Sequence, residues 1–322
     1  MKSVVVGLGS IGKVHIAVLK ELGMEIAAVC DISEQALNKY SAFKGYSDYE
    51  TMLNEIQPDV VHICTPHYLH TEMILAALKL DINVLCEKPM CIKEEDIPLI
   101  LEAEKSSKAQ LGVCFQNRYN AENKYVKEYL KDKKILNATG NVIWHRDREY
   151  YASSPWRGRW KTEGGGVLIN QAVHTLDLLQ WFLGLPQTVC ASVSNLTLKD
   201  QIEVEDTAAL VCRGKENSFV FFATNGAAAP LPVEVVIQTE EGVIRTRPGS
   251  VTVNDELIVL KDRAKEYGKK CYGRGHTWLI KDFYDCIKQG KKFDIDGAEA
   301  AKVVKIVLAA YKSNGETVEI KE

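Results

Sequence analysis

A glycine-rich turn near the N-terminus has the spacing of a phosphate-binding loop. Gly7, Gly9 and Gly12 form the pattern G-x-G-x-x-G, with Ser10 and Ile11 between the second and third glycines. The pattern follows an apolar run and opens a helix-like stretch, which is the context that dinucleotide binding requires. The first glycine allows a tight turn, the second lets the backbone approach a pyrophosphate, and the third lets the helix pack closely on the sheet. We therefore expect these five residues to hold a dinucleotide, with its phosphates at the helix N-terminus.

An acidic residue follows the next apolar run, where a dinucleotide ribose would lie. Asp31 comes about twenty residues after Gly12, the separation at which a carboxylate binds the ribose 2′-hydroxyl of NAD. A 2′-phosphate would be repelled there, and no Arg or Lys follows directly. The sequence therefore favours NAD. Ser33 leaves NADP possible, and a simple helix-capping role for Asp31 is the alternative.

Polar residues also follow three further apolar runs of the first third of the chain. Ligands of parallel sheets bind beyond the carboxyl ends of the strands. The residues at these ends are Thr65, Pro66 and His70; Glu87 and Lys88; and Gln116, Asn117 and Arg118. Lys88 stands before a proline that fixes the chain, so its side chain can project into a crevice, although a solvated loop lysine is the alternative. His15 and His70 either line the cofactor site or have a structural role.

A triple glycine in the second half leads into an expected helix over residues 167–183 that carries polar side chains. Asn170 and His174 are four residues apart and share a helical face, and Asp177 lies close to it. Histidine is a base suited to neutral pH, so His174 can accept a proton. A His-x-x-Asp half of a metal site is the alternative reading. No further ligand cluster stands out and no Cys-x-x-Cys occurs, so we expect no metal.

Strand and helix patterns divide the chain into two expected domains. Short apolar runs alternate with helix-like segments up to about residue 115, which predicts a doubly wound parallel sheet. Longer alternating runs follow, among them residues 207–213, 218–224 and 242–247, and they predict a large, mostly antiparallel open sheet with helices. A hairpin turn is expected at Asn254-Asp255. We therefore expect an α/β fold with a Rossmann domain over residues 1–120 and an α+β domain over residues 121–322. The second face of the large sheet needs cover, which predicts a homo-oligomer.

Composition excludes several classes of protein. The 322 residues carry 40 Lys and Arg against 43 Asp and Glu, a net charge of −3, so a nucleic-acid partner is not expected. No apolar run is long enough for a membrane span or a signal-peptide core. The nine cysteines are expected to be free thiols, which favours a cytoplasmic location.

Together these motifs resemble the glucose–fructose oxidoreductase / inositol 2-dehydrogenase / rhizopine catabolism (Gfo/Idh/MocA) family. The glycine loop, Thr65-Pro66, Glu87-Lys88-Pro89 and the glycine-led His174-x-x-Asp177 helix occur in the order of that family. The resemblance covers essentially the whole chain. It implies NAD(P)-dependent oxidation of a hydroxyl group on a sugar, sugar derivative, cyclitol or sugar nucleotide, by a homodimer or homotetramer.

The resemblance also implies roles for single residues. Lys88 would lie near the nicotinamide and the substrate hydroxyl, and His174 would accept the proton. Trp156 and Arg157 would contact cofactor and substrate, and His276 would lie in the substrate cleft with Asn117 and Arg118. An aromatic and arginine-rich loop before the glycines suits a carbohydrate, which has an apolar face and many hydroxyls, although an interface loop fits equally well.

One residue departs from the family pattern. Many members have aspartate four residues before the histidine, whereas this chain has Asn170, which binds a hydroxyl but cannot take its proton. The proton of the substrate hydroxyl must then be accepted by His174 or Lys88. Two other functions stay open: a glycosidase or lyase that oxidises its sugar only transiently, and a non-catalytic dinucleotide sensor.

Overall fold

The computed structural model describes residues 1–261, 265–268 and 273–321, which form two compact units. The first unit comprises Met1–Tyr119 and Ala264–Ala301, and the second comprises Asn120–Arg263 and Lys302–Glu322. The predicted division at 120/121 differs from this one, because it assigned residues 264–301 to the second domain. Contacts within the first unit explain why residues 264–301 belong to it. Helix α9 (Gly275–Gln289) packs on helix α1 (Ser10–Glu21), and the backbone N–H of Val113 donates to the carbonyl of Ile295 at 2.9 Å.

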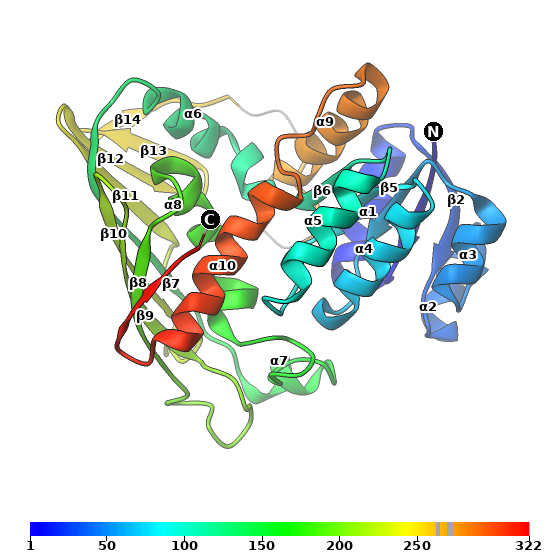
Figure 1. Cartoon of the computed structure of the whole chain (residues 1–322), viewed down its shortest axis with the longest axis horizontal. Helices are drawn as coiled ribbons and strands as arrows, with labels where there is room; N and C mark the ends of the chain where they lie inside the picture. The colour runs from blue at the N-terminus through cyan, green and yellow to red at the C-terminus, as the bar shows by residue number, and fades with distance from the viewer. Residues whose placement is uncertain (262–264, 269–272, 322) are drawn as a thin grey trace. The chain divides into compact units, whose positions relative to one another are not determined.

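A six-stranded parallel sheet forms the centre of the first unit (Figure 1). Its strands, in spatial order, are β3 (Lys44–Tyr46), β2 (Glu25–Cys30), β1 (Lys2–Val6), β4 (Val60–Ile63), β5 (Asn83–Glu87) and β6 (Leu111–Cys114). Strands β4 and β6 are buried along their whole length, as continuous apolar runs predict for strands covered on both faces. The predicted Rossmann-type sheet is therefore confirmed. Its strand order reverses between β1 and β4, which is where such sheets bind ligands.

Helices connect these strands. The sequence patterns predicted neither strand β3 nor helix α3 (Tyr49–Ile56). The helices are α1, α2 (Glu34–Asn38), α3 (Tyr49–Ile56), α4 (His70–Lys79), α5 (Asp96–Ser106) and the short 3₁₀ helices η1 (His67–Leu69) and η2 (Gln116–Tyr119). Strand β3 was not predicted because it has three residues and no apolar run. Helix α3 was not predicted although Asp48 caps it, accepting from the N–H of Thr51 at 2.8 Å.

A nine-stranded sheet forms the second unit, and its predicted mostly antiparallel character is confirmed. In spatial order the strands are β14 (Glu256–Ile258), β13 (Ser250–Val253), β12 (Gly242–Arg247), β11 (Glu234–Thr239), β7 (Ile135–Ile143), β10 (Ser218–Thr224), β9 (Thr207–Arg213), β8 (Thr188–Ser194) and β15 (Thr317–Glu319). Among the described strands of this sheet, only the β7–β10 pair is parallel. Asn254 and Asp255 have φ values of 50° and 64° and form the predicted hairpin turn.

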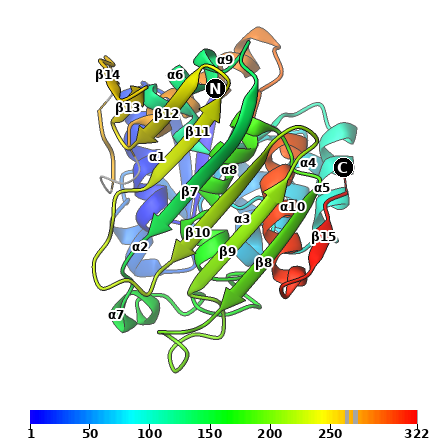
Figure 2. The ribbon, with the colours of Figure 1, turned by 90° about the vertical axis from the view of Figure 1, so that its left-hand side faces the viewer.

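Helices cover one face of this sheet and leave the other open. Helices α6 (Ala121–Tyr129), α8 (Val173–Leu183) and α10 (Gly297–Ser313) lie behind the strands in Figure 2, and α7 (Arg148–Ala152) lies at one end. Side chains alternate accordingly. In β10, Phe219 and Phe221 are buried toward the helices, whereas Val220 and Phe222 are 50% and 38% exposed on the open face.

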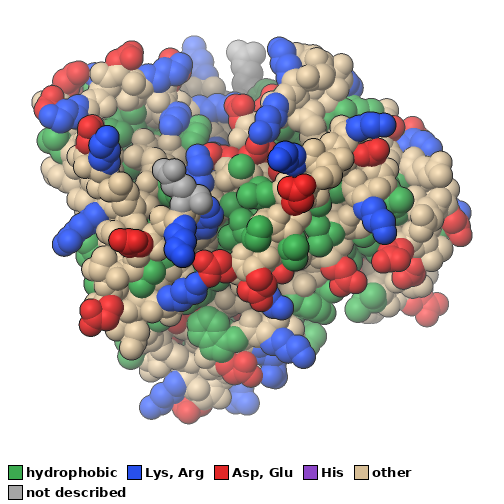
Figure 3. All heavy atoms as spheres, viewed as in Figure 1, with side chains coloured by type: hydrophobic (Ala, Val, Ile, Leu, Met, Phe, Trp, Pro, Cys, Tyr) green, Lys and Arg blue, Asp and Glu red, His purple; other side chains and the backbone are tan. Residues whose placement is uncertain are grey.

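The described surface mixes charges of both signs. Basic and acidic side chains alternate over the face drawn in Figure 3. None of the helices in the described part of the chain is long and apolar enough to cross a membrane. All cysteines that the structure describes are free thiols, and most are buried.

Candidate functional site

The glycine loop of the first unit is fixed by backbone contacts that exclude side chains. Gly7 has φ +86°, and a Cβ there would lie 2.5 Å from the carbonyl oxygen of Cys64. A Cβ on Gly12 would lie 1.9 Å from the carbonyl oxygen of Gly7. Gly9 precedes α1 and gives no side-chain cap to its first turn, in which Ser10 is exposed and Ile11 is half-buried. These features suit a pyrophosphate.

Asp31 braces this loop rather than capping a helix. Its Oδ2 accepts from the N–H of Leu8 at 2.7 Å, and its Oδ1 accepts from the N–H of Ser33 at 2.8 Å. The cap of α2 is Ser33, whose hydroxyl accepts from the N–H of Ala36. A carboxylate has about four acceptor positions, so both Asp31 oxygens retain capacity for ribose hydroxyls. Glycine loop and acidic residue thus fit an NAD-type dinucleotide.

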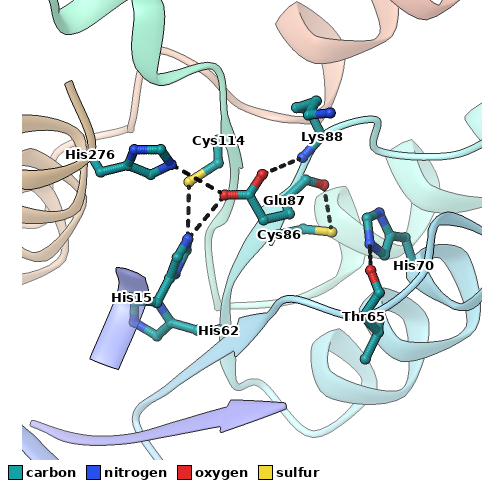
Figure 4. Close-up of polar contacts among 9 residues, drawn as sticks. All are labelled: His15, His62, Thr65, His70, Cys86, Glu87, Lys88, Cys114 and His276. Atoms are coloured by element: carbon teal, nitrogen blue, oxygen red, sulfur yellow. Dashed lines mark hydrogen bonds and ion pairs between the residues drawn. The ribbon is translucent and has the colours of Figure 1, made fainter. Parts of the chain in front are cut away.

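A histidine ties together the turns that follow β4 and β5. The ring nitrogens of His70 lie 2.7 Å from the carbonyl oxygen of Pro89 and 2.9 Å from that of Thr65. Figure 4 shows the contact with Thr65. Burial lowers the pKa of His70, although both carbonyl contacts oppose the shift. Thr65 and Pro66 are half-buried at the strand end. His70 therefore positions the loops at the predicted cofactor site.

Glu87 lies buried beside Lys88 in a cluster of histidines. Its Oε1 is 3.0 Å from Nε2 of His15 and 3.6 Å from Nε2 of His276. Its Oε2 accepts from the backbone N–H of Lys88 at 3.3 Å. Burial raises the pKa of Glu87, but the contacts from His15 and then His276 outweigh burial and hold it well below its usual range. The half-buried Lys88 side chain therefore follows a carboxylate that stays charged.

Two residues predicted to contact substrate have other partners within the first unit. The guanidinium of Arg118 is 4% exposed and lies 2.9 Å from a carboxylate oxygen of Glu299. His276 is buried against Glu87, as described above. Both contacts join segments distant in sequence, which strand-end position alone could not reveal, and the substrate role of both residues stays a prediction. Of their predicted neighbours, Gln116 is buried and Asn117 is half-buried on η2.

The glycine triplet of the second unit serves close packing. A Cβ on Gly165 would lie 2.0 Å from the hydroxyl oxygen of Tyr311, and one on Gly166 would lie 1.9 Å from the carbonyl oxygen of Glu205. The carboxylate of Glu205 accepts from the N–H groups of Gly166 at 2.8 Å and Leu168 at 2.9 Å, and from Tyr311 at 2.9 Å. Burial raises the pKa of Glu205 to about 7 despite these bonds.

The predicted continuous helix over 167–183 is wrong in its first part. Val167–Gln171 forms a π-helical turn, and α8 begins only at Val173. The α-helical spacing argument for Asn170 and His174 therefore does not hold across this junction. Both side chains are half-buried, and the Asn170 amide nitrogen donates to Oε1 of Glu163.

The loop that carries Trp156 and Arg157 is held by its own aromatic residues. The Arg157 guanidinium lies 4.5 Å from the ring centroid of Tyr150 and donates to the hydroxyl of Ser153 at 2.9 Å. The carbonyl of Trp156 accepts from Thr162 at 2.7 Å. Both predicted residues belong to the second unit, as do Asn170 and His174.

Sequence reasoning missed three buried residues that organise the site. Glu163 and Glu205 brace the segment that carries Asn170, and His62 contacts His15 beneath the strand ends. None belongs to a motif with its own spacing. A buried carboxylate or imidazole is recognised by its partners, and these partners lie far away in the sequence.

Comparison with curated proteins finds sugar-related dehydrogenases. Inositol 2-dehydrogenase of Salmonella typhimurium is 31% identical over 193 residues, 57% of this chain and 54% of that protein. The chain therefore matches about half the length of this relative. Myo-inositol 2-dehydrogenase of Thermotoga maritima is 23% identical over 97% of this chain and 96% of that protein.

Solved structures and family models agree with this result. The WlbA dehydrogenase of Bordetella pertussis, solved with NADH and UDP-GlcNAcA, is 26% identical, with a TM-score of 0.87 over 100% of this chain and 99% of that one. Residues 1–115 match the model of an oxidoreductase family with an NAD-binding Rossmann fold, and residues 125–245 match the GFO/IDH/MocA C-terminal domain. The resemblance predicted from the motifs is thus confirmed, and the chain belongs to the Gfo/Idh/MocA family of oxidoreductases.

Proposed function

We propose that this protein oxidises a hydroxyl group of a sugar, sugar derivative, cyclitol or sugar nucleotide, using NAD. The observation that carries the proposal is the first unit's glycine loop, braced by Asp31, in the same fold as the turn that presents Lys88. The relatives named inositol 2-dehydrogenase and the WlbA structure with NADH and UDP-GlcNAcA support this substrate class.

Alcohol oxidation removes a proton from oxygen and a hydride from carbon. NAD supplies the hydride acceptor when bound. His174 accepts the proton, because an imidazole is an effective base near neutral pH. Lys88 supplies a cation that stabilises negative charge developing on the substrate oxygen. The carboxylate of Glu87 accepts from the backbone N–H of Lys88 and so holds the start of the turn that carries Lys88.

Asn170, Trp156 and Arg157 recognise the substrate in this proposal. The Asn170 amide binds hydroxyls without titrating, so it contributes orientation and leaves proton transfer to His174. Trp156 offers an aromatic face to the apolar side of a sugar ring. Arg157, stacked on Tyr150, offers a rigid guanidinium to a carboxylate or phosphate.

The proposal also includes assembly of the chain with further copies of itself. The open face of the nine-stranded sheet carries Val220 opposite Val211 in the strand register, and these side chains are 50% and 40% exposed. Apolar side chains that pair on an uncovered sheet face favour burial against a partner. We propose a homodimer or homotetramer formed through this face.

The experiment is a substrate panel with NAD and, separately, NADP. Sugars, sugar acids, cyclitols and UDP-sugars are mixed with the protein, and reduced nicotinamide is followed by absorbance. The proposal expects NADH to accumulate with at least one class. Product formation without NADH accumulation would identify a redox-neutral glycosidase or lyase instead, and binding of NADH with no turnover in any class would identify a sensor.

A further inference from the structure

Five buried side chains form an unbroken chain of contacts beneath the strand ends of the first unit. Ser3 Oγ lies 2.6 Å from the Tyr284 hydroxyl, which lies 2.9 Å from Nε2 of His62. Nδ1 of His62 lies 2.8 Å from Nδ1 of His15, and Nε2 of His15 lies 3.0 Å from Oε1 of Glu87. All five are buried, Glu87 being the most exposed at 5%. We call these residues the Glu87 chain.

The carboxylate end group fixes the direction of one hydrogen bond, and the other three follow for a neutral His15. A carboxylate only accepts, so Nε2 of His15 carries the proton. If His15 is neutral, its Nδ1 must accept from Nδ1 of His62. Nε2 of a neutral His62 then accepts from Tyr284, and Tyr284 accepts from Ser3. All four hydrogen bonds therefore point toward Glu87, with neutral rings and one negative charge.

The surroundings favour the neutral state of His62. Burial is the largest cause that holds the pKa of His62 well below its usual value, so this ring is neutral. The Cys114 thiol lies 3.8 Å from Nε2 of His15, and burial raises its pKa well above the usual value. His276 stands 3.6 Å from Oε1 of Glu87 on the other side, as Figure 4 shows. Two imidazoles therefore lie beside Oε1 of Glu87, and the Cys114 thiol lies beside one of them.

The second oxygen of Glu87 leads to the proposed site. Oε2 accepts from the backbone N–H of Lys88, which the dashed line in Figure 4 marks. His15 lies on α1, the helix that the glycine loop opens, and His62 lies on β4, two residues before Cys64 and Thr65 begin the next turn. The carboxylate of Glu87 thus links α1, the helix that the glycine loop opens, to the turn that carries Lys88.

We propose that Glu87 and His15 are positioning residues, and that the one-way Glu87 chain sets the placement of Lys88 relative to the glycine-loop helix. The proposal deepens the function proposed above and rests on it for the role of Lys88. A buried carboxylate with a charge-assisted bond at each oxygen is a rigid link. A small shift of a catalytic group lowers the rate steeply while leaving cofactor binding intact.

The same atoms raise the possibility of a metal site. Ligand atoms of His15, Glu87 and His276 lie within 4.8 Å of one another. A metal on Nε2 of His15 would displace the proton that the chain requires on that nitrogen. The two arrangements are therefore mutually exclusive, and metal content becomes one outcome of the test.

The first experiment replaces Glu87 by glutamine in the full-length protein. Glutamine has one oxygen for two N–H donors, so either the bond to His15 or the bond to Lys88 is lost. We expect cooperative unfolding, an NADH dissociation constant within about threefold of the unchanged protein, and a kcat lower by about tenfold or more. Glu104→Gln is the matched control: this half-buried carboxylate of α5 accepts from the N–H of Gly297 at 3.2 Å and belongs to neither the glycine loop nor the turn of Lys88. It should leave kcat unchanged.

The second experiment needs no substrate and reads the unchanged protein directly. Ring ¹⁵N spectra of histidine-labelled protein report which nitrogen of each imidazole is protonated. Using His15→Asn and His62→Asn only to assign signals, we expect His15 protonated at Nε2 and His62 protonated at Nδ1.

The opposite tautomers, or a metal bound at one equivalent per chain, would overturn the proposal. So would a Glu87→Gln variant with kcat within about twofold of normal, since a positioning role requires a larger loss. If no substrate in the panel is oxidised, the proposed function fails, while the ring spectra still decide whether the Glu87 chain exists.

Discussion

The side-chain amide nitrogen of Asn170 donates a hydrogen bond to Oε1 of the buried Glu163. The other oxygen of Glu163 accepts from the N–H of Gly158 at 2.5 Å, so the carboxylate is held from two sides. This bond fixes the orientation of the amide, with its nitrogen toward Glu163 and its oxygen on the opposite side. Glu163 thus supplies a carboxylate next to the position where many family members have aspartate.

Replacing Asn170 by aspartate should destabilise the protein. Two carboxylates in contact cannot both be charged without repulsion, and the hydrogen bond disappears. We expect a loss of about 1–3 kcal/mol in unfolding free energy, larger at pH 8 than at pH 6. Adding Glu163→Gln to Asn170→Asp restores a donor facing an acceptor and should recover part of the loss. Denaturant unfolding of the three proteins checks this. A double variant less stable than Asn170→Asp alone would contradict the assigned pairing.

Glu205 should make stability depend on pH. Its pKa is raised from 4.5 to about 7 by burial, so the folded protein binds a proton that the unfolded chain has released. Its stabilising contribution is therefore fully present below pH 4.5 and is lost as pH rises through about 7. Relative to Glu205→Gln, the unchanged protein should lose up to about 3 kcal/mol between pH 4.5 and pH 8. The measurement is urea unfolding of both proteins across this range. Parallel pH profiles would show that Glu205 does not titrate in the folded state.

Asp31 should determine the choice of dinucleotide. Asp31→Ala removes the repulsion of a 2′-phosphate and also the acceptor for the N–H groups of Leu8 and Ser33. We expect weaker NADH binding and a smaller preference for NADH over NADPH. Calorimetric titration with both cofactors gives the ratio, and Ser33→Ala serves as the neighbouring control. A preference for NADPH in the unchanged protein would mean that Asp31 does not select against the phosphate.

A charge on the open sheet face should break the proposed assembly. Val220 is 50% exposed in the middle of β10, and Val220→Lys places a charge where a second copy would bury it. Sedimentation should show a dimer or tetramer for the unchanged protein and a 36.0 kDa species for the variant. Leu99→Lys changes a residue of similar exposure on α5 and should leave the assembly intact. Finding only the 36.0 kDa species in the unchanged protein would exclude this interface at the concentration tested.

The sequence predicted the elements that carry strong periodic patterns. Strands β9, β10 and β12 have the predicted bounds, because alternation on a sheet with one covered face is a local signal. The junction at Val167–Gln171 could not be predicted, since π-helical geometry there depends on Glu205, which accepts from the N–H groups of Gly166 and Leu168. Local pattern cannot report a bond between such distant segments.

The residues of the candidate site also fall into two groups, those that local sequence predicts and those that only the folded chain reveals. The glycine loop follows from its spacing, because tight turns and close backbone approach restrict residue type locally. His62 and Glu163 act through contacts that only the folded chain creates. The substrate contacts of Arg118 and His276 stay predictions, and the folded chain adds that their side chains lie beside Glu299 and Glu87.

The central claim is that Lys88 and His174 act on one proton transfer in an NAD-dependent oxidation. The most direct test is the set of Lys88→Met, His174→Ala and the double variant, assayed for kcat on the best substrate of the panel. We expect each single change to lower kcat by about 10²–10⁴-fold while NADH binding weakens little. Because residues that serve one step are not additive, the double variant should be little slower than the worse single variant. Near-normal turnover of His174→Ala, or strictly multiplicative losses in the double variant, would contradict the account.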